Sequence, residues 1–391
     1  MSDVRALFIS TSNAGVGYWR VWSWVLAAQR NKAMFAHAPW YEKGLNETHP
    51  WEVDVMDPYY KHRILDELND HAKKANVVVM QMAHTPAALN MFLSLKETYK
   101  IPVVAEIDDN MISTADYNPA NPFYSQGEDF RKIAIDQFKA ADAMIVSTPY
   151  LREVYSEFCY YIEVVPNAID FKVWDNLKRR DTKGQVRIGW AGGASHNEDL
   201  KLIEPAMRNI LAKYKNVRFV FVHGIPNFLK NIDGVECIQR FERIDRYPQY
   251  LASRRLDIGL APLVDNAFNR GKSNLRWLEY SALKVPTVAS NVGHFKQTIK
   301  DHYDGLLVEP DEWESALVEL IENEDRRRWI GKHAYRRVRT DFNIDKEVFY
   351  YAKVLKEIVD RGLTKKIEEA DYYAPLGVVP AGEELQEGLT V

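Results

Sequence analysis

Short apolar runs rich in β-branched residues alternate with longer helix-like stretches along the whole chain. In the first half the runs cover 6–10, 76–82, 102–108, 143–147 and 162–166, and in the second half 186–192, 217–223, 235–239, 256–262, 285–290 and 305–310. Continuous rather than alternating apolar strands are typical of parallel sheets covered on both faces, and the intervening helices supply the crossovers. The pattern therefore predicts an α/β fold with two Rossmann-like domains, whose parallel sheets face a central cleft.

A charged, loop-like stretch at 177–184 separates the two series of runs. We predict an N-terminal Rossmann-like acceptor domain over 1–168, a linker over 169–184 and a C-terminal Rossmann-like donor domain over 185–344. A last helical segment follows over 345–372, placed to pack back on the N-terminal domain, and a Pro/Gly-rich, acidic tail over 373–391. A length of 391 residues suits two domains of ordinary size.

Composition excludes several classes of protein. Lys and Arg number 51 against 55 Asp and Glu, so the net charge of −4 gives no overall basic field for nucleic acid or anionic membranes. Neither an apolar run of membrane-spanning length nor a signal-peptide pattern is visible, which predicts a cytoplasmic protein. Cys159 and Cys237 stand in separate predicted domains, which favours reduced thiols.

In each half of the chain, a glycine-containing turn follows the first predicted strand. Gly15 and Gly17 lie in the first, and Gly192 and Gly193 in the second. Glycine lets a ligand approach the backbone, and the free N–H groups of the following helix favour a diphosphate. The first turn does not complete a dinucleotide fingerprint, because Trp19 or Arg20 stands where its third glycine belongs. An NAD enzyme is therefore disfavoured.

The segment 260–295 carries the densest candidate chemistry. Lys272 and Arg276 are four residues apart, which places them on one face of a predicted helix over 273–283, and Glu279 follows about a turn later. Cations at a helix start can neutralise a departing pyrophosphate, and a carboxylate can accept hydrogen bonds from a ribose. Taken alone, the same residues also suit a surface helix laced with ion pairs.

Several segments resemble one family in the order that the family shows. They are VVPNAIDFKVW (164–174), GWAGGASHNEDL (189–200), GKSNLRWLEYSALKVPTVAS (271–290), DGLLVEP (304–310) and ENEDRRRWIGKHAYRRVRTDFN (322–343). Together they make about half of the chain similar to family-4-type retaining glycosyltransferases of GT-B fold. The resemblance implies a donor site for a nucleoside diphosphate sugar in the C-terminal domain.

The resemblance also implies roles for residues of the second domain. Glu279 matches the second glutamate of the family's Glu-x7-Glu element, which binds the ribose, whereas Gly271 stands where the first glutamate belongs. That departure leaves the donor sugar unassigned. Lys272 and Arg276 match a cationic diphosphate clamp, and Lys201 is the nearby candidate at the family's more common position.

In the first domain the resemblance assigns Gly15 and Gly17 to a loop that approaches the reacting diphosphate. His84, at the mouth of a predicted strand, matches a histidine near the donor sugar, with a structural or capping role as the alternative. Asp108 and Asp109 end another strand and are candidates to orient or deprotonate an acceptor hydroxyl. We expect no metal site at this pair.

These observations predict a transferase that moves a sugar from a UDP- or GDP-linked donor to a hydroxyl, with retention and without metal or cofactor. The acceptor stays open among a glycan, a lipid-linked sugar and a modified nucleic acid. The aromatic residues at 18–24 leave peripheral membrane contact open as well. Three alternatives remain, namely a DNA-modifying glycosyltransferase, a nucleotide-sugar epimerase or hydrolase, and a non-catalytic sugar-nucleotide-binding protein.

Overall fold

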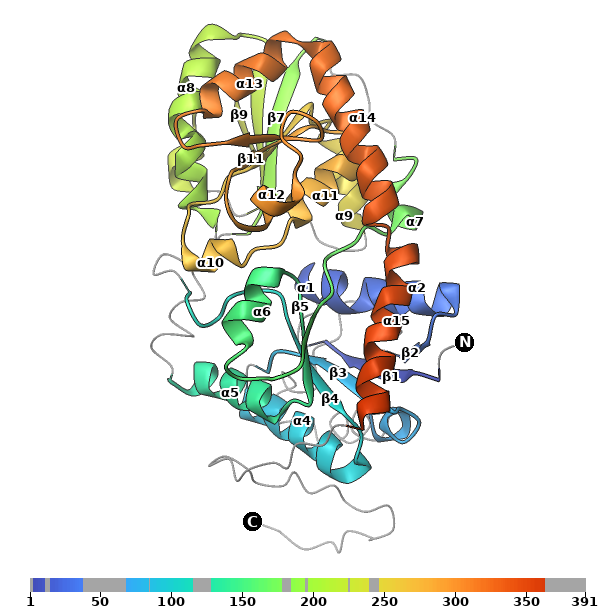
Figure 1. Cartoon of the computed structure of the whole chain (residues 1–391). Helices are drawn as coiled ribbons and strands as arrows, with labels where there is room; N and C mark the ends of the chain where they lie inside the picture. Colours follow the sequence, from blue (N-terminus) through green and yellow to red (C-terminus); the bar gives the residue numbers. More distant parts are fainter. Residues whose placement is uncertain are drawn as a thin grey trace, which may run out of the picture.

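The computed structural model describes residues 3–10, 15–37, 68–83, 85–114, 128–177, 184–193, 196–223, 226–238 and 246–362. They form two six-stranded parallel sheets, one in each half of the chain, with helices on both faces (Figure 1). The strand orders are β2-β1-β3-β4-β5-β6 and β12-β11-β10-β7-β8-β9. This arrangement confirms the predicted pair of Rossmann-like α/β domains.

The N-terminal sheet contains strands that are mostly buried along their whole length. They are β1 (Arg5–Ile9), β2 (Phe35–His37), β3 (Val77–Gln81), β4 (Val103–Ile107), β5 (Ala143–Val146) and β6 (Ile162–Val164). The helical elements around them are α1 (Gly15–Gly17), a π-helical turn η1 (Tyr18–Trp22), α2 (Ser23–Asn31), α4 (Pro86–Tyr99), α5 (Glu128–Ala140) and α6 (Pro149–Tyr155). Strand β2 was not predicted, because three residues at a sheet edge give too short a pattern.

The C-terminal domain repeats the plan. Its strands are β7 (Val186–Gly192), β8 (Val217–His223), β9 (Val235–Ile238), β10 (Ile258–Ala261), β11 (Thr287–Ser290) and β12 (Leu306–Val308). Its helical elements are η4 (Asp199–Ile203), α8 (Glu204–Lys213), η5 (Asn227–Leu229), α9 (Tyr247–Ser253), α10 (Ala267–Arg270), α11 (Leu275–Ala282), α12 (Gly293–Thr298), α13 (Trp313–Glu322) and α14 (Glu324–Asp341). Helix α11 begins at Leu275, so Lys272 precedes it and the prediction that Lys272 shares a helix face with Arg276 is wrong.

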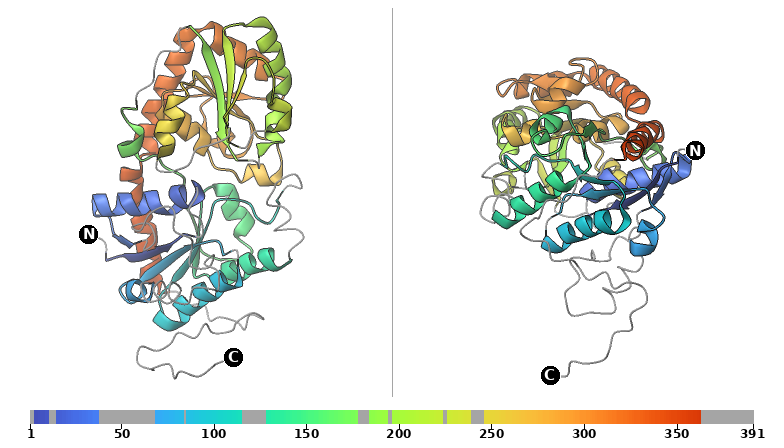
Figure 2. Two further views of the ribbon diagram at one scale, coloured as in Figure 1. Left: turned by 180° about the vertical axis from the view of Figure 1, so that it is seen from behind. Right: turned by 60° about the horizontal axis from the view of Figure 1, so that its bottom comes forward.

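Helix α15 (Ile344–Arg361) leaves the C-terminal domain and lies against α2, as the views from opposite sides show (Figures 1 and 2). Tyr351 of α15 packs edge-on against Trp24 at 5.1 Å between ring centroids, and Arg30 of α2 donates a hydrogen bond to Asp345 at 2.9 Å. The last helix therefore ties the two halves of the chain together.

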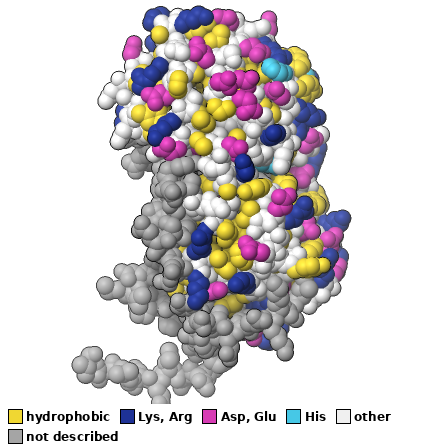
Figure 3. All heavy atoms as spheres, turned by 60° about the vertical axis from the view of Figure 1, so that its left-hand side comes forward, with side chains coloured by type: hydrophobic (Ala, Val, Ile, Leu, Met, Phe, Trp, Pro, Cys, Tyr) yellow, Lys and Arg dark blue, Asp and Glu magenta, His cyan; other side chains and the backbone are white. Residues whose placement is uncertain are grey.

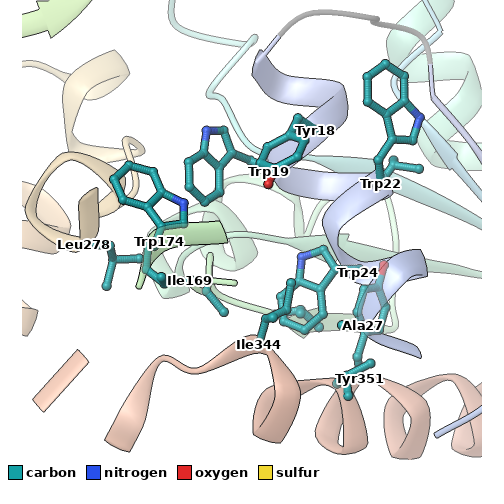
Figure 4. Close-up of a cluster of buried hydrophobic side chains, with 14 of the residues drawn as sticks. Tyr18, Trp19, Trp22, Trp24, Ala27, Ile169, Trp174, Leu278, Ile344 and Tyr351 are labelled. Carbon is teal, nitrogen blue, oxygen red and sulfur yellow. The ribbon is translucent and has the colours of Figure 1, made fainter. Parts of the chain in front are cut away.

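The aromatic side chains at 18–24 belong to the core. Tyr18, Trp19, Trp22 and Trp24 are each at most 5% exposed. The ring centroids of Trp19 and Trp174 are 6.0 Å apart (Figure 4). Trp174 comes from α7 (Phe171–Trp174), so the predicted linker carries a short packed helix. Because these rings are buried against one another, the exposed aromatic surface that membrane contact would need is not formed by them.

Two further observations bear on possible partners. Within the described ranges, no helix is both long and apolar enough to cross a lipid bilayer. On the face shown in Figure 3, basic and acidic side chains are interspersed rather than gathered by sign.

Candidate active site

A cavity of about 400 Å³ lies between the two domains, at the carboxyl ends of strands from both sheets. Parallel sheets bind ligands at this edge, because the loops that follow the strands converge there. Eight of the predicted site residues line it, namely Gly15, Asp108, Asp109, Gly192, Gly193, Lys272, Arg276 and Glu279. Gly17 is buried in α1 and does not line the cavity, and His84 lies outside the described residues.

The turn after β7 holds the side chain of Arg276 against its backbone. A Cβ on Gly192 would lie 2.5 Å from a terminal nitrogen of Arg276, so only glycine leaves room for the guanidinium there. The guanidinium also lies 5.0 Å from the ring centroid of Trp190. No carboxylate in the described part of the chain pairs with it within ion-pairing distance. Its positive charge is therefore available to an anion in the cavity.

Lys272 differs from Arg276 in having an acidic partner. Its Nζ lies 2.9 and 3.0 Å from the two carboxylate oxygens of Asp109, which belongs to the other domain. An anion that enters the cavity would compete with Asp109 for this ammonium. We therefore assign Lys272 a weaker hold on a diphosphate than Arg276.

The loop before α11 is docked on the N-terminal domain by three further hydrogen bonds. Asn110 donates to the carbonyl of Ala267 at 3.0 Å, Thr148 to the carbonyl of Gly271 at 3.3 Å, and Asn167 to Ser273 Oγ at 2.8 Å. This loop carries Lys272, so the position of the lysine depends on both domains.

Close packing at this seam explains the departure at Gly271. A Cβ at this residue would lie 2.9 Å from Leu151 Cδ2 and 3.1 Å from Asn110 Cβ, so a glutamate here would require these neighbours to move. Carboxylates on this side of the cavity come instead from the end of β4, through Asp108 and Asp109.

The two carboxylates after β4 have different environments. Burial raises the pKa of Asp108 to about 8, and the nearby charges of Asp109 and Glu106 add to this effect, against the opposing influence of Arg20 and Lys272. Near neutral pH Asp108 is therefore largely protonated and can donate or later accept a proton. With the described residues alone, the pair completes no group of three potential metal ligands.

Glu279 is buried on the opposite side of the cavity. Tyr247 donates a hydrogen bond to its Oε2 at 3.1 Å, and burial raises its pKa to about 7 although Arg276 and this hydrogen bond lower it. Tyr247 was missed from the sequence, because it stands on α9, far from any recognised motif.

His196 was missed as well. It lines the cavity beside the Gly192–Gly193 turn, with Nδ1 2.8 Å from an Asp199 oxygen. In contrast, Lys201 is exposed and pairs with Glu198 at 2.8 Å, so it does not reach the cavity. No sequence pattern distinguished His196 from the polar residues around it.

Glu279→Gln is expected to change how stability depends on pH. A folded-state pKa near 7, above the ordinary 4.5, means that the folded protein keeps a proton that the unfolded chain has lost. Stability is therefore lost as pH rises from about 4.5 through 7, by at most about 3 kcal/mol, and glutamine removes this loss. Urea unfolding at pH 5 and pH 8 should show that the free energy of unfolding of the variant, relative to that of the wild type, is greater at pH 8.

The exposed Glu153→Gln is the matched control for that experiment, and its stability relative to the wild type should not change with pH. If the difference in the free energy of unfolding between Glu279→Gln and the wild type is the same at both pH values, the assigned environment of Glu279 is contradicted.

Comparison with known proteins finds a family similarity within the C-terminal domain. Residues 185–323 match the family model described as "Glycosyl transferases group 1". Most of the C-terminal domain is therefore similar to group 1 glycosyltransferases. A D-inositol 3-phosphate glycosyltransferase of Corynebacterium kroppenstedtii is 35% identical over 106 residues, which are 26% of this chain and 22% of that protein. The match thus spans about a fifth of the length of this curated relative.

Solved structures show that the whole chain has the GT-B fold of glycosyltransferases. HepE of Anabaena, in complex with UDP and glucose, is similar with a TM-score of 0.62 and 13% identity over 90% of this chain and 99% of that one. Sucrose-phosphate synthase of Thermosynechococcus elongatus is similar with a TM-score of 0.64 and 13% identity, over 91% of this chain and 100% of that one. A glycosyltransferase of Rickettsia africae is similar with a TM-score of 0.59 and 16% identity, over 91% of this chain and 98% of that one. In this chain the cavity lies between the two domains of that fold.

Proposed function

We propose that this chain is a glycosyltransferase that moves a sugar from a nucleoside diphosphate sugar to a hydroxyl acceptor. The observation that carries the proposal is the cavity itself. On one side it presents the guanidinium of Arg276, which no described carboxylate pairs with, beside a glycine turn, and on the other side the carboxyl groups of Asp108 and Asp109. The first side suits a diphosphate and the second suits sugar or acceptor hydroxyls.

The nucleoside half of the donor fits beside Glu279, whose carboxyl group can accept hydrogen bonds from a ribose. HepE, which shares the fold, was solved with UDP and with UDP-glucose, and this supports a nucleotide donor of the same class. We propose a UDP- or GDP-linked sugar as the donor, with no metal or cofactor in the reaction.

In the proposed reaction the bond between the anomeric carbon and the diphosphate oxygen breaks, and a bond to the acceptor oxygen forms. Arg276 and Lys272 stabilise the negative charge that builds up on the leaving diphosphate. The proton of the acceptor hydroxyl passes to Asp108 in its ionised form, or to the departing diphosphate. We propose retention at the anomeric carbon on the strength of the family resemblance.

The acceptor depends on loops over 37–58 and 110–127, most of which lie outside the described residues. A glycan, a lipid-linked sugar and a modified nucleic acid all offer the required hydroxyl. The mixed charges of the face in Figure 3 give no support to a nucleic-acid groove there.

The test is a panel of UDP-glucose, GDP-mannose, ADP-glucose and TDP-glucose, with thermal unfolding and donor consumption measured without acceptor. One nucleotide family should stabilise the protein, by about 2.7 kcal/mol at one hundred times its Kd, with little hydrolysis. Arg276→Ala should weaken this stabilisation, whereas Arg328→Ala, an exposed arginine on α14, should leave it unchanged.

Each other outcome of the panel has a defined meaning. Rapid consumption of a donor without acceptor would favour an epimerase or hydrolase. Stabilisation by a donor, followed by no transfer to any hydroxyl compound, would favour a non-catalytic binding protein. No stabilisation by any of the four sugars would overturn the proposed donor site.

A further inference from the structure

We propose that His196 takes up a proton when a nucleoside diphosphate sugar binds, and that the resulting imidazolium then holds a diphosphate oxygen through Nε2. This inference rests on the proposed function, and it assigns a proton-coupled contact within the same site. Such a contact would make donor binding sensitive to pH near neutrality.

The fold presents His196 to the cavity at the place where a diphosphate is expected. It follows the Gly192–Gly193 turn, and its backbone N–H donates to the carbonyl of Gly193 at 3.3 Å. Its ring packs edge-on against Trp190 at 5.9 Å between centroids, and its side chain is only 13% exposed. Arg276 lies over the same Trp190 ring, so the imidazole and the guanidinium share one wall of the cavity.

Asp199 fixes the orientation of the imidazole. One carboxylate oxygen of this fully buried residue lies 2.8 Å from His196 Nδ1. The other oxygen accepts hydrogen bonds from the backbone N–H of Val264 at 2.8 Å and from Asn269 Nδ2 at 2.7 Å. Because Asp199 is held from three sides, Nδ1 carries the hydrogen and Nε2 is left for the cavity. Throughout the described part of the chain, nothing else hydrogen-bonds the ring.

The charges around the ring explain why its protonation should follow the ligand. In the free protein burial lowers the pKa of His196, the hydrogen bond to Asp199 opposes this, and the positive charges of Arg276 and Lys272 lower it further. The imidazole is therefore neutral near pH 7. A diphosphate with two negative charges would offset both cations and favour the charged ring.

The other titratable groups that line this cavity, besides Arg276, are Asp108, Asp109, His223, Tyr247, Lys272 and Glu279. Asp108 and Glu279 have raised pKa values and could also exchange protons when a ligand binds. A diphosphate would favour their protonated forms as well, so total proton uptake does not by itself identify His196. The experiment must therefore separate these residues by substitution.

The experiment is titration calorimetry of the full chain with the panel sugar that binds most tightly, in buffers of different ionisation enthalpy between pH 6 and pH 8. A nucleotide sugar has both phosphates esterified and loses no proton of its own in this range. The wild type should take up about one proton through His196, and its affinity should fall by up to about tenfold per pH unit between the pKa of His196 in the free protein and its higher pKa in the bound state.

His196→Gln should lose that proton uptake and bind about tenfold more weakly at pH 6. His196→Lys should bind without this proton uptake and with little pH dependence, because its charge is permanent. The exposed His302→Gln is the matched control and should behave as the wild type.

Undiminished proton uptake in His196→Gln, or its loss in Asp108→Asn, His223→Gln or Glu279→Gln instead, would overturn the role of His196. Tight binding with no proton uptake in the wild type would overturn it too, and would leave the proposed function intact. Binding of none of the four sugars would instead remove the proposed function.

Discussion

Arg276→Ala is expected to lower the turnover of the nucleotide sugar by about 10²- to 10³-fold. The guanidinium lies against the backbone of Gly192 and over Trp190, in the cavity between the two domains. No described carboxylate lies within ion-pairing distance of it, although Glu279 is near enough to interact with it electrostatically, so its charge can act on the leaving diphosphate. Removing one such fixed contact to a developing negative charge costs about 2.7–4 kcal/mol of transition-state stabilisation. Release of nucleoside diphosphate in the presence of a hydroxyl acceptor, under saturating donor, measures the effect.

Two variants separate charge from packing at this position. Arg276→Lys keeps a cation but cannot lie flat over the indole or bind a phosphate with two parallel hydrogen bonds, so it should recover only part of the rate. Arg328→Ala removes an exposed arginine that pairs with Glu324 on α14, and it should not change the rate. An Arg276→Ala enzyme within about threefold of the wild type would remove Arg276 from the mechanism.

Arg20→Met should destabilise the protein by about 3–5 kcal/mol. Arg20 and Glu106 are each 1% exposed, and the Arg20 Nε to Glu106 Oε1 distance is 2.6 Å. Removing one partner of a buried ion pair leaves the other charge without compensation in the core. Urea unfolding at neutral pH should show the loss as a lower midpoint with a similar slope.

The double variant Arg20→Met/Glu106→Gln is the decisive companion. It removes both charges, so it should be more stable than Arg20→Met alone, which would identify the unpaired carboxylate as the source of the loss. Arg208→Met breaks an exposed pair with Glu204 and should cost less than about 1 kcal/mol. A loss of that small size in Arg20→Met would contradict the account of a buried pair.

The same ion pair connects to the donor site. Arg20 donates to Asn167 at 3.0 Å, and Asn167 donates to Ser273 Oγ at 2.8 Å, beside Lys272. A chain of buried polar contacts therefore runs from the N-terminal core to the loop before α11. Arg20→Met should accordingly weaken donor binding in the protein that remains folded.

The sequence by itself determined the two α/β series, the positions of most strands along the chain and the turns that line the cavity. Parallel strands covered on both faces need unbroken apolar runs, and glycine turns mark close backbone approach, so both features are encoded locally. The runs at 186–192 and 217–223 match β7 and β8 at both ends. Local patterning also brought Arg276, Glu279 and the β4 carboxylates to attention before their contacts were known.

Only the tertiary structure decided how these residues act together. The pairing of Lys272 with Asp109 joins positions 163 residues apart, and the packing of Gly271 on Leu151 depends on how the domains meet. His196 acquires its partner and its neighbouring cations, and Glu279 its burial, only when distant elements converge. Periodicity records which face of an element is buried, whereas the charge state of a side chain depends on what the folded chain places beside it.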